Sequence, residues 1–433
     1  MVDAVKIFRN ATLSNGEVVD IAIQGQDILE VGKNLSVSGE DIDCTGLIAL
    51  QGFVDLHTHL REPGFEASET ILTGSRAAAK GGFTAVHAMA NTAPVADTAA
   101  VVEQVHALGV AAGYVHVQPI GAVTKGLEGK QLADLLKMNK SRAQVTVFSD
   151  DGKCVFDSLL MRRALEYVKA FDGVIAQHAQ DPNLTFDAQM NESQLAFELG
   201  LTGWPSVAEE AIIARDVLLA EHVGSRLHIC HVSTAGSVEI IRWAKARGIK
   251  VTAEVTPHHL LLTEDLVKDY NPVYKVNPPL RSQTDVLALR AAVADRTIDI
   301  IATDHAPHTA DSKDCEWGQA AFGMIGLETA LAVAQTTLVE TGLVGWERIE
   351  ELLSTNPAAI SGLDRHGKNL VASNPANLVF INPTAKTKVS GQSESKSSNN
   401  PYLGLELFGE IVHTVFEGRF TVKNKLVQEL NND

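Results

Sequence analysis

Two histidines, His57 and His59, lie two residues apart at the end of an apolar segment. On a β-strand, this spacing points both imidazoles to the same side of the backbone, where they can bind one metal ion. A loop with charged residues, 60–64, follows at once, and the C-terminal end of a strand is where a barrel enzyme holds its catalytic groups. Taken alone, the pair fits two buried, hydrogen-bonded histidines equally well.

Ligand-type side chains also end four later strand-like segments: the pair Asp150-Asp151, then His178, His231 and Asp304. The C-terminal ends of barrel strands converge, so these residues are expected to meet in space. A single Asp at a strand end is more often a helix cap or a turn former, so the joint pattern carries the inference. Four His and two Asp suit one or two borderline cations, with zinc as the default.

The elements that must position these residues alternate between short apolar segments and longer helical patterns, which predicts a (β/α)₈ TIM barrel. No phosphate-binding glycine loop follows an early strand, which counts against a nucleotide-binding fold. A capping box is expected at Ser206 and Glu209, and an Asp cap at Asp97. The expected strands are Gly52–Leu60, Phe83–Met89, Val115–Ile120, Gln144–Ser149, Val174–His178, Arg226–His231, Lys250–Val255 and Ile298–Thr303. The expected helices are Ser68–Lys80, Asp97–Leu108, Asp157–Ala170, Ser206–His222 and Ser233–Arg247.

The two ends of the chain differ from the middle, because they carry short alternating segments separated by turn signals. We expect residues 1–51 and 366–433 to pair into one small β-domain, beside a catalytic barrel formed by residues 52–365. The polar stretch Thr384–Asn400 is expected to be a solvated loop.

Composition limits the function classes. The 433 residues are 45% hydrophobic and carry a formal net charge of −17, which argues against nucleic acid or an anionic membrane as a partner. An anionic substrate stays possible, because local cations override the global field. The four cysteines lie far apart and no apolar segment is long enough to span a bilayer, so a reduced, cytoplasmic protein is expected.

Longer motifs extend over nearly the whole chain. They are HLREPG at 59–64, SDDG at 149–152, KVNPPLR at 275–281 and TDHAPH at 303–308. With these blocks the chain resembles the class I dihydroorotases of the amidohydrolase superfamily. It departs from the family pattern at Gln51 and at Ala90, where a Pro is usual, and Ala90 could loosen the loop that presents Asn91.

The resemblance implies the reversible, zinc-dependent cyclisation of N-carbamoyl-L-aspartate to L-dihydroorotate in pyrimidine synthesis. It implies two zinc ions bridged by Asp151, where related enzymes use a carboxylated lysine; spacing alone would not choose Asp151 over Asp150. Asp304 is the implied acid and base, and Arg61 is the implied carboxylate-binding residue. The implied metal ligands are His57, His59, Asp151, His178, His231 and Asp304, and the implied substrate contacts are Arg61, Asn91, Asn277, His308, Phe322 and Gly323.

The polar segment Thr309–Ala321 fits a lid over the barrel mouth and an ordinary surface loop equally well. A homodimer is favoured by the resemblance, and an aspartate carbamoyltransferase is an expected partner enzyme. Two rival readings stay open: another cyclic amidohydrolase, such as a hydantoinase or allantoinase, or an inactive dihydroorotase-like scaffold. The scaffold reading is disfavoured, because all six ligand types are present.

Overall fold

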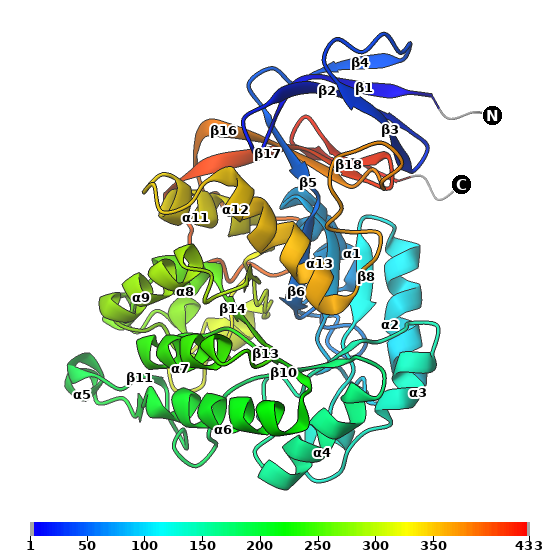
Figure 1. Cartoon of the computed structure of the whole chain (residues 1–433). Helices are drawn as coiled ribbons and strands as arrows, with labels where there is room; N and C mark the ends of the chain where they lie inside the picture. The colour runs from blue at the N-terminus through cyan, green and yellow to red at the C-terminus, as the bar shows by residue number, and fades with distance from the viewer. Residues whose placement is uncertain (1–3, 431–433) are drawn as a thin grey trace.

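The expected strands close into a barrel in the computed structural model, which describes residues 4–430 (Figure 1). Three parallel strands form one arc in the order β6-β7-β8, and five form the other in the order β15-β14-β13-β10-β9. Parallel bridges from Gly121 to Phe148 and from Thr58 to His305 join the arcs, so the (β/α)₈ prediction is confirmed. The barrel strands are β6 Phe53–Thr58, β7 Phe83–Ala88, β8 His116–Pro119, β9 Val147–Phe148, β10 Val174–Gln177, β13 Arg226–Ile229, β14 Val251–Val255 and β15 Ile300–Ile301.

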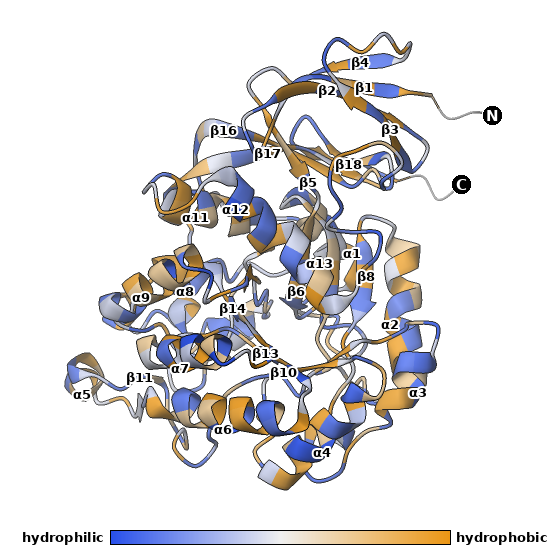
Figure 2. Cartoon of the chain, viewed as in Figure 1, coloured by the Kyte–Doolittle hydropathy of each residue, from blue (hydrophilic) through white to orange (hydrophobic). Residues whose placement is uncertain are grey.

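Helices surround the barrel, and they carry both hydrophobic and hydrophilic residues (Figure 2). The five expected helices are all present as α1, α2, α4, α6 and α7. Their bounds, with those of the further helices, are α1 Ile71–Lys80, α2 Ala99–Ala112, α3 Leu135–Lys140, α4 Ser158–Lys169, α5 Gln194–Leu199, α6 Val207–Val223, α7 Ala235–Ala246, α8 Pro257–Leu261, α9 Gln283–Ala294, α10 Ala310–Lys313, α11 Ala330–Ala334, α12 Trp346–Glu350 and α13 Asn356–Ser361. Single turns of 3₁₀ helix lie at Lys125–Leu127, Glu264–Val267, Pro272–Tyr274 and Leu327–Thr329, and π-helical turns lie at Gln335–Val339 and Glu351–Thr355.

Two of the expected helix caps are wrong. Thr98 is the N-cap of α2, while the Asp97 carboxylate accepts a hydrogen bond from the Gly126 amide at 2.9 Å. Ser206 makes no side-chain cap bond. Glu209 instead accepts hydrogen bonds from the amide and hydroxyl of Ser233, in the loop after β13. The long-range bonds of these carboxylates replace the local bonds that sequence spacing suggests.

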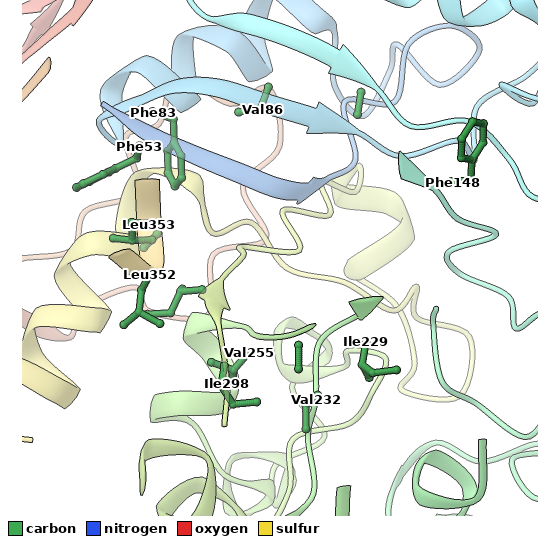
Figure 3. Close-up of a cluster of buried hydrophobic side chains, with 14 of the residues drawn as sticks. Phe53, Phe83, Val86, Phe148, Ile229, Val232, Val255, Ile298, Leu352 and Leu353 are labelled. Atoms are coloured by element: carbon green, nitrogen blue, oxygen red, sulfur yellow. The ribbon is translucent and has the colours of Figure 1, made fainter. Parts of the chain in front are cut away.

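Apolar side chains fill both the barrel interior and the layer between strands and helices. The interior set includes Leu56, Val147, Val174 and Ile300 from different strands, and Ile360 of α13 joins it. In the outer layer, Phe53 and Phe83 meet edge to face with ring centroids 5.7 Å apart, beside Leu353 (Figure 3). The barrel is therefore a packed core that holds the strand ends in place.

The two chain ends form one mixed sheet above the barrel, as the sequence predicts (Figure 1). Its strand order is β19-β18-β17-β16-β5-β1-β2-β3, with β4 paired to β1. The N-terminal strand β5 runs antiparallel to the C-terminal strand β16, and only Gly52 separates β5 from β6. The strands of this sheet are β1 Lys6–Leu13, β2 Val18–Gln24, β3 Asp27–Gly32, β4 Glu40–Asp43, β5 Ile48–Gln51, β16 Leu378–Lys388, β17 Glu406–Phe416, β18 Arg419–Lys423 and β19 Leu426–Val427.

The expectation that Thr384–Asn400 is a solvated loop is wrong in two respects. Strand β16 continues to Lys388, and Ser395, Ser397 and Asn399 are buried. The side-chain amide of Asn399 donates to the carbonyls of Ala306 and Gly323 at 3.0 and 3.1 Å. This segment is polar because it supplies hydrogen bonds to neighbouring loops.

The connecting segment between β10 and α6 also contains elements that were not expected. It contains the short parallel pair β11 (Met190–Asn191) and β12 (Gly203–Trp204), with α5 between them. The guanidinium of Arg281, which is 1% exposed, donates to the Asn191 side chain and the Trp204 carbonyl, both at 2.8 Å. These hydrogen bonds hold the connecting segment against the barrel.

Across residues 4–430, no helix is both long and apolar enough to cross a membrane.

Candidate metal centre

His57 and His59 lie at the end of β6, at the centre of a buried group of imidazoles and carboxylates. The Nε2 atom of His57 is 3.4 Å from carboxylate oxygens of both Asp151 and Asp304. The Nε2 atom of His59 lies 3.3 Å from Asp151 and 3.1 Å from Asp304. One strand end therefore presents two imidazoles to the same two carboxylates.

Asp151 is the shared member of the group. Its Oδ1 atom lies 3.2 Å from His178 Nδ1 and 3.3 Å from His231 Nε2, while its Oδ2 atom faces His59. The neighbouring Asp150 turns away, because its side chain accepts hydrogen bonds from the amides of Val123 and Thr124 at 2.8 and 2.9 Å. Spacing alone did not choose between Asp150 and Asp151 as the ligand, and Asp151 is the one that faces the histidines.

The six sequence-predicted ligands come together although they lie on five strand ends. His178 follows β10, His231 follows β13 and Asp304 follows β15. The backbone of His231 and of Asp304 has positive φ angles of 32° and 47°. Non-glycine residues in this region carry strain that the surrounding structure must hold, and such strain is concentrated at functional sites.

Opposite charges set the protonation of this group. Burial raises the pKa of the Asp151 carboxyl, but His57, His178 and His231 outweigh it and hold that pKa well below its usual range. Burial likewise lowers the pKa of His57, but Asp151, Glu254 and Asp304 raise it well above its usual value. The ionised aspartates thus favour positive charge at the imidazoles that face them, and either protons or a bound cation can supply that charge.

The donor set fits metal ions. Among the described residues, three sets of ligand atoms lie close enough to hold one ion each. Two of them share Asp151, namely His57, His59 and Asp151, and Asp151, His178 and His231; the third is His57, Cys230 and Glu254. His57 Nε2 is buried and has no hydrogen-bond partner among the described residues, although it points at two carboxylates. A buried polar atom of this kind is explained by a ligand that it binds. Imidazole and carboxylate are ligands that zinc accepts.

Three of the four histidines have their second ring nitrogen held by an oxygen. Glu254 lies 2.6 Å from His57 Nδ1, and Asn91 lies 2.9 Å from His59 Nδ1. Gln180 lies 2.7 Å from His178 Nε2. Each oxygen accepts from an N–H, so the nitrogen that faces Asp151 keeps its lone pair for a metal.

The residues suggested as substrate contacts lie around the same mouth. His308 Nε2 is 2.8 Å from the carbonyl oxygen of Phe322, which can only accept, so Nε2 carries the hydrogen. Arg61 Nη2, at 3.3 Å from that nitrogen, keeps its hydrogens for another acceptor, while Arg61 Nε donates to the Pro307 carbonyl at 3.1 Å. Burial lowers the pKa of Arg61 to about 10, so the guanidinium is charged at neutral pH.

Asn277 and Gly323 complete the mouth. The Asn277 amide donates to Gln180 at 3.1 Å, and its Oδ1 is buried with no partner among residues 4–430. Gly323 has a φ of 142°, and an added Cβ would lie 2.8 Å from His308 Nε2. The backbone can approach His308 this closely only because position 323 has no side chain.

The segment Thr309–Ala321 is tied down by two buried lysines. Lys313 Nζ donates to the carbonyls of Pro272, Lys275 and Ala321 at 2.8, 3.0 and 2.8 Å. Lys275 Nζ donates to the Trp317 carbonyl at 2.6 Å. Whether the segment opens as a lid stays a prediction.

Two residues that support the site, Glu254 and Asn399, were not predicted from the sequence. Glu254 is a lone carboxylate within the apolar strand β14. Because a buried charge needs partners, this position in the sequence was a signal of a supporting residue. Asn399 lies in a stretch rich in Ser and Asn, which resembles an exposed loop and offers no such signal. His258 and His259 lie in α8, where His259 contacts Thr256 and Pro279 at 2.8 and 3.3 Å.

Sequence comparison finds close relatives over nearly the full length. Residues 46–237 match the family model described as "Dihydro-orotase-like". A dihydroorotase of Leifsonia xyli subsp. xyli is 63% identical over 431 residues, which cover 99% of this chain and 98% of that protein. A dihydroorotase of Streptomyces coelicolor is 62% identical, with 96% and 98% covered, and one of Mycobacterium tuberculosis is 50% identical, with 94% and 96% covered.

Solved structures with the same fold carry other names. An L-hydantoinase (dihydropyrimidinase) from Arthrobacter aurescens superimposes with a TM-score of 0.88 at 25% identity, covering 99% of this chain and 98% of that one. A dihydropyrimidinase from Brevibacillus agri gives a TM-score of 0.86 at 21% identity, with 98% and 96% covered. At such identity the likeness supports the barrel and the adjoining sheet.

Proposed function

The chain belongs to the dihydroorotase family, and we propose that it catalyses the reversible cyclisation of N-carbamoyl-L-aspartate to L-dihydroorotate. The observation that carries this proposal is the position of Asp151, whose carboxylate lies within 3.4 Å of four histidines from three strand ends. Relatives named dihydroorotase, at up to 63% identity over nearly the whole chain, support the choice of reaction.

The proposed ligands are His57, His59, Asp151, His178, His231 and Asp304, with two zinc ions bridged by Asp151. The two overlapping ligand sets that share Asp151 support this arrangement. Bound zinc supplies a Lewis acid for the amide carbonyl and lowers the pKa of a water to about 7.

Asp304 is the proposed acid and base. In the hydrolytic direction, water adds to a ring amide carbonyl and the carbon–nitrogen bond breaks. A proton must therefore leave the water and reach the departing nitrogen. His57 and His59 outweigh the burial that raises the pKa of Asp304 and keep that pKa below its usual value, so the carboxylate is ionised and able to accept the proton. Its Oδ1, 3.1 Å from His59 Nε2, lies within the group of proposed metal ligands.

Arg61 and Asn91 are proposed to hold the carboxylate that the substrate keeps throughout the reaction, and His308 is proposed as a further substrate contact beside them. Among residues 4–430, Arg61 Nη2 faces only the hydrogen-bearing Nε2 of His308, and the side-chain N–H groups of Asn91 meet no acceptor, so both are suited to a carboxylate. Burial and the nearby Arg61 lower the pKa of His308 to about 3, so this ring is neutral at neutral pH. The free Oδ1 of Asn277 and the backbone at Phe322 and Gly323 are proposed to contact the ring.

The rival readings each predict something different. A hydantoinase-like enzyme would use a bridging lysine where this chain has Asp151, and it would not need Arg61 for a substrate carboxylate. A scaffold would lack ligands, whereas all six proposed ligands lie together here. Side-by-side assays with dihydroorotate, hydantoin and allantoin distinguish the three, and hydrolysis of hydantoin in preference to dihydroorotate would overturn the proposal.

The metal proposal has its own measurement. Purified protein is expected to contain close to two zinc ions per chain by elemental analysis. Removing them with a chelator should abolish dihydroorotate hydrolysis, and adding zinc should restore it. Full activity in the metal-free protein would contradict the assignment.

Further features of the setting also remain proposals. We propose a cytoplasmic location, supported by the four cysteines, none of which forms a disulfide. A homodimer, and an association with aspartate carbamoyltransferase, rest on the family resemblance. The division into residues 52–365 and residues 1–51 with 366–433 is supported by the junction at Gly52 between β5 and β6.

A further inference from the structure

Glu254 lies deep in the barrel, one residue before the end of β14, and only 1% of it is exposed. Its Oε1 atom is 2.6 Å from His57 Nδ1 and accepts the backbone N–H of His231 at 3.1 Å. Its Oε2 atom is 3.0 Å from His228 Nε2. One buried carboxylate thus contacts two of the residues proposed as metal ligands, and each of those two belongs to a different ligand set.

The contacts fix which nitrogen of His57 carries hydrogen. An ionised carboxylate only accepts, so His57 Nδ1 must be the donor. In the neutral ring, Nε2 then keeps its lone pair. That atom is buried, faces Asp151 and Asp304 at 3.4 Å, and has no hydrogen-bond partner among the described residues. The tautomer imposed by Glu254 is the one that a metal ligand needs.

A second histidine braces the carboxylate from the other side. His228 is fully buried on β13, and its Nδ1 lies 2.8 Å from the hydroxyl of Thr252. With His228 on one oxygen and His57 on the other, Glu254 has no room to rotate without losing a bond. The hydrogen-bonded series Thr252–His228–Glu254–His57 therefore connects strands β13 and β14 with β6 and the ligand group.

Glu254 differs from the residues that hold the other imidazoles. His59 is held by Asn91 and His178 by Gln180, which are neutral amides in loops. Glu254 is charged and lies in a strand, and it also holds the backbone of His231, whose φ of 32° needs support. Its loss would release one ligand of each set at the same time.

We propose that Glu254 is a positioning residue that keeps His57 in the metal-binding tautomer and holds the His231 backbone in place, so that both metal positions depend on it. The proposal rests on the metal site proposed above. It predicts that changes at Glu254 act on zinc affinity beyond any effect on folding.

The test compares zinc dissociation constants, measured by chelator competition, in the wild type and three variants. Glu254→Met removes the acceptor and should weaken zinc binding about 10- to 100-fold. Glu254→Gln keeps an oxygen for His57 and should lose less. Glu350→Met is the matched control, because Glu350 is a half-buried carboxylate that bonds Ser14 and Gln51 and touches no proposed ligand; its zinc affinity should equal that of the wild type.

The outcomes separate this inference from the proposed function. If the wild type binds no zinc, the metal site itself fails. If the wild type binds zinc and Glu254→Met binds it equally tightly, while only its melting temperature falls, Glu254 is structural and the inference is overturned.

A measurement on the wild type covers the case in which Glu254→Met does not fold. Nitrogen NMR of the zinc-loaded protein, labelled at histidine and assigned with a His57→Gln variant, should show hydrogen on Nδ1 of His57. Hydrogen on Nε2 would overturn the proposal.

Discussion

Asp304, the proposed acid and base, is buried among histidines. Its Oδ1 lies 3.4 and 3.1 Å from the Nε2 atoms of His57 and His59. If the charge of Asp304 is removed, the five other proposed metal ligands remain. The chemistry and the binding of metal can therefore be separated at this residue.

Asp304→Asn should lower kcat for dihydroorotate hydrolysis by at least about 100-fold, because general acid–base catalysis contributes about that much or more. The zinc content should stay close to that of the wild type. Steady-state kinetics and elemental analysis measure the two quantities. Asp295→Asn, at a carboxylate paired with Arg242 on the surface, is the control. Near wild-type kcat in Asp304→Asn would refute the acid–base role.

Arg61→Lys should raise KM for N-carbamoyl-L-aspartate by about 10- to 100-fold, since a charged hydrogen bond contributes about 1.5–3 kcal/mol and lysine lacks the planar fork of arginine. The effect on kcat should be smaller. Arg419→Lys is the control, because Arg419 is exposed and donates only to the Gly113 carbonyl. An unchanged KM would mean that the substrate carboxylate binds elsewhere.

At the scale of elements, the segment Thr309–Ala321 is held by two buried lysines, Lys275 and Lys313, which have no carboxylate partner among residues 4–430. Burial, with Lys275 nearby, lowers the pKa of Lys313 to about 7, far below the 10.5 of a free lysine. Between these two pH values the unfolded chain binds more protons than the folded one. Stability from this residue therefore rises as the pH rises from about 7 to about 10.5, by up to about 1.4 kcal/mol per pH unit.

Lys313→Met should remove this pH dependence. The difference in melting temperature between wild type and variant should grow in favour of the wild type as the pH is raised from 7 to 9.5. Thermal unfolding at several pH values measures it, with the exposed Lys130→Met as control. A difference that does not change with pH would contradict the lowered pKa of Lys313.

The elements and the proposed ligands followed from the sequence to different degrees. The histidine pair and the strand-end residues are visible because strand ends converge in a barrel, whatever the details. Asp151 was separated from Asp150 only by resemblance, since the hydrogen bonds from Val123 and Thr124 that occupy Asp150 come from another loop. Glu254 and Asn399 were missed for the same reason: their partners lie 197 and up to 93 residues away in the chain.

At the scale of the whole molecule, the chain carries a net charge of −17, whereas the mouth of the barrel holds the charged guanidinium of Arg61, which we propose binds an anionic substrate. The sheet above the barrel has a separate small core, in which the rings of Phe8 and Phe380 stack with centroids 4.5 Å apart. Phe8 lies on β1 and Phe380 on β16, so this contact joins the two ends of the chain.

Phe380→Ala should destabilise the protein by about 3–5 kcal/mol, because it removes a fully buried ring from this core and leaves a cavity. Chemical denaturation of the zinc-loaded protein measures the loss. Phe186→Ala is the control, since that ring is 75% exposed and its removal should cost little. If the two variants are equally stable, the sheet does not depend on the contact between the chain ends.

The junction at Gly52 has a consequence for synthesis on the ribosome. Strand β5 leads directly into β6, which carries the first two histidines, and one of its two neighbours is β16, at Leu378–Lys388. A nascent chain has made nearly nine-tenths of its length before that neighbour emerges. Strand β5, which leads into the barrel, therefore has one unpaired edge until β16 has been synthesised.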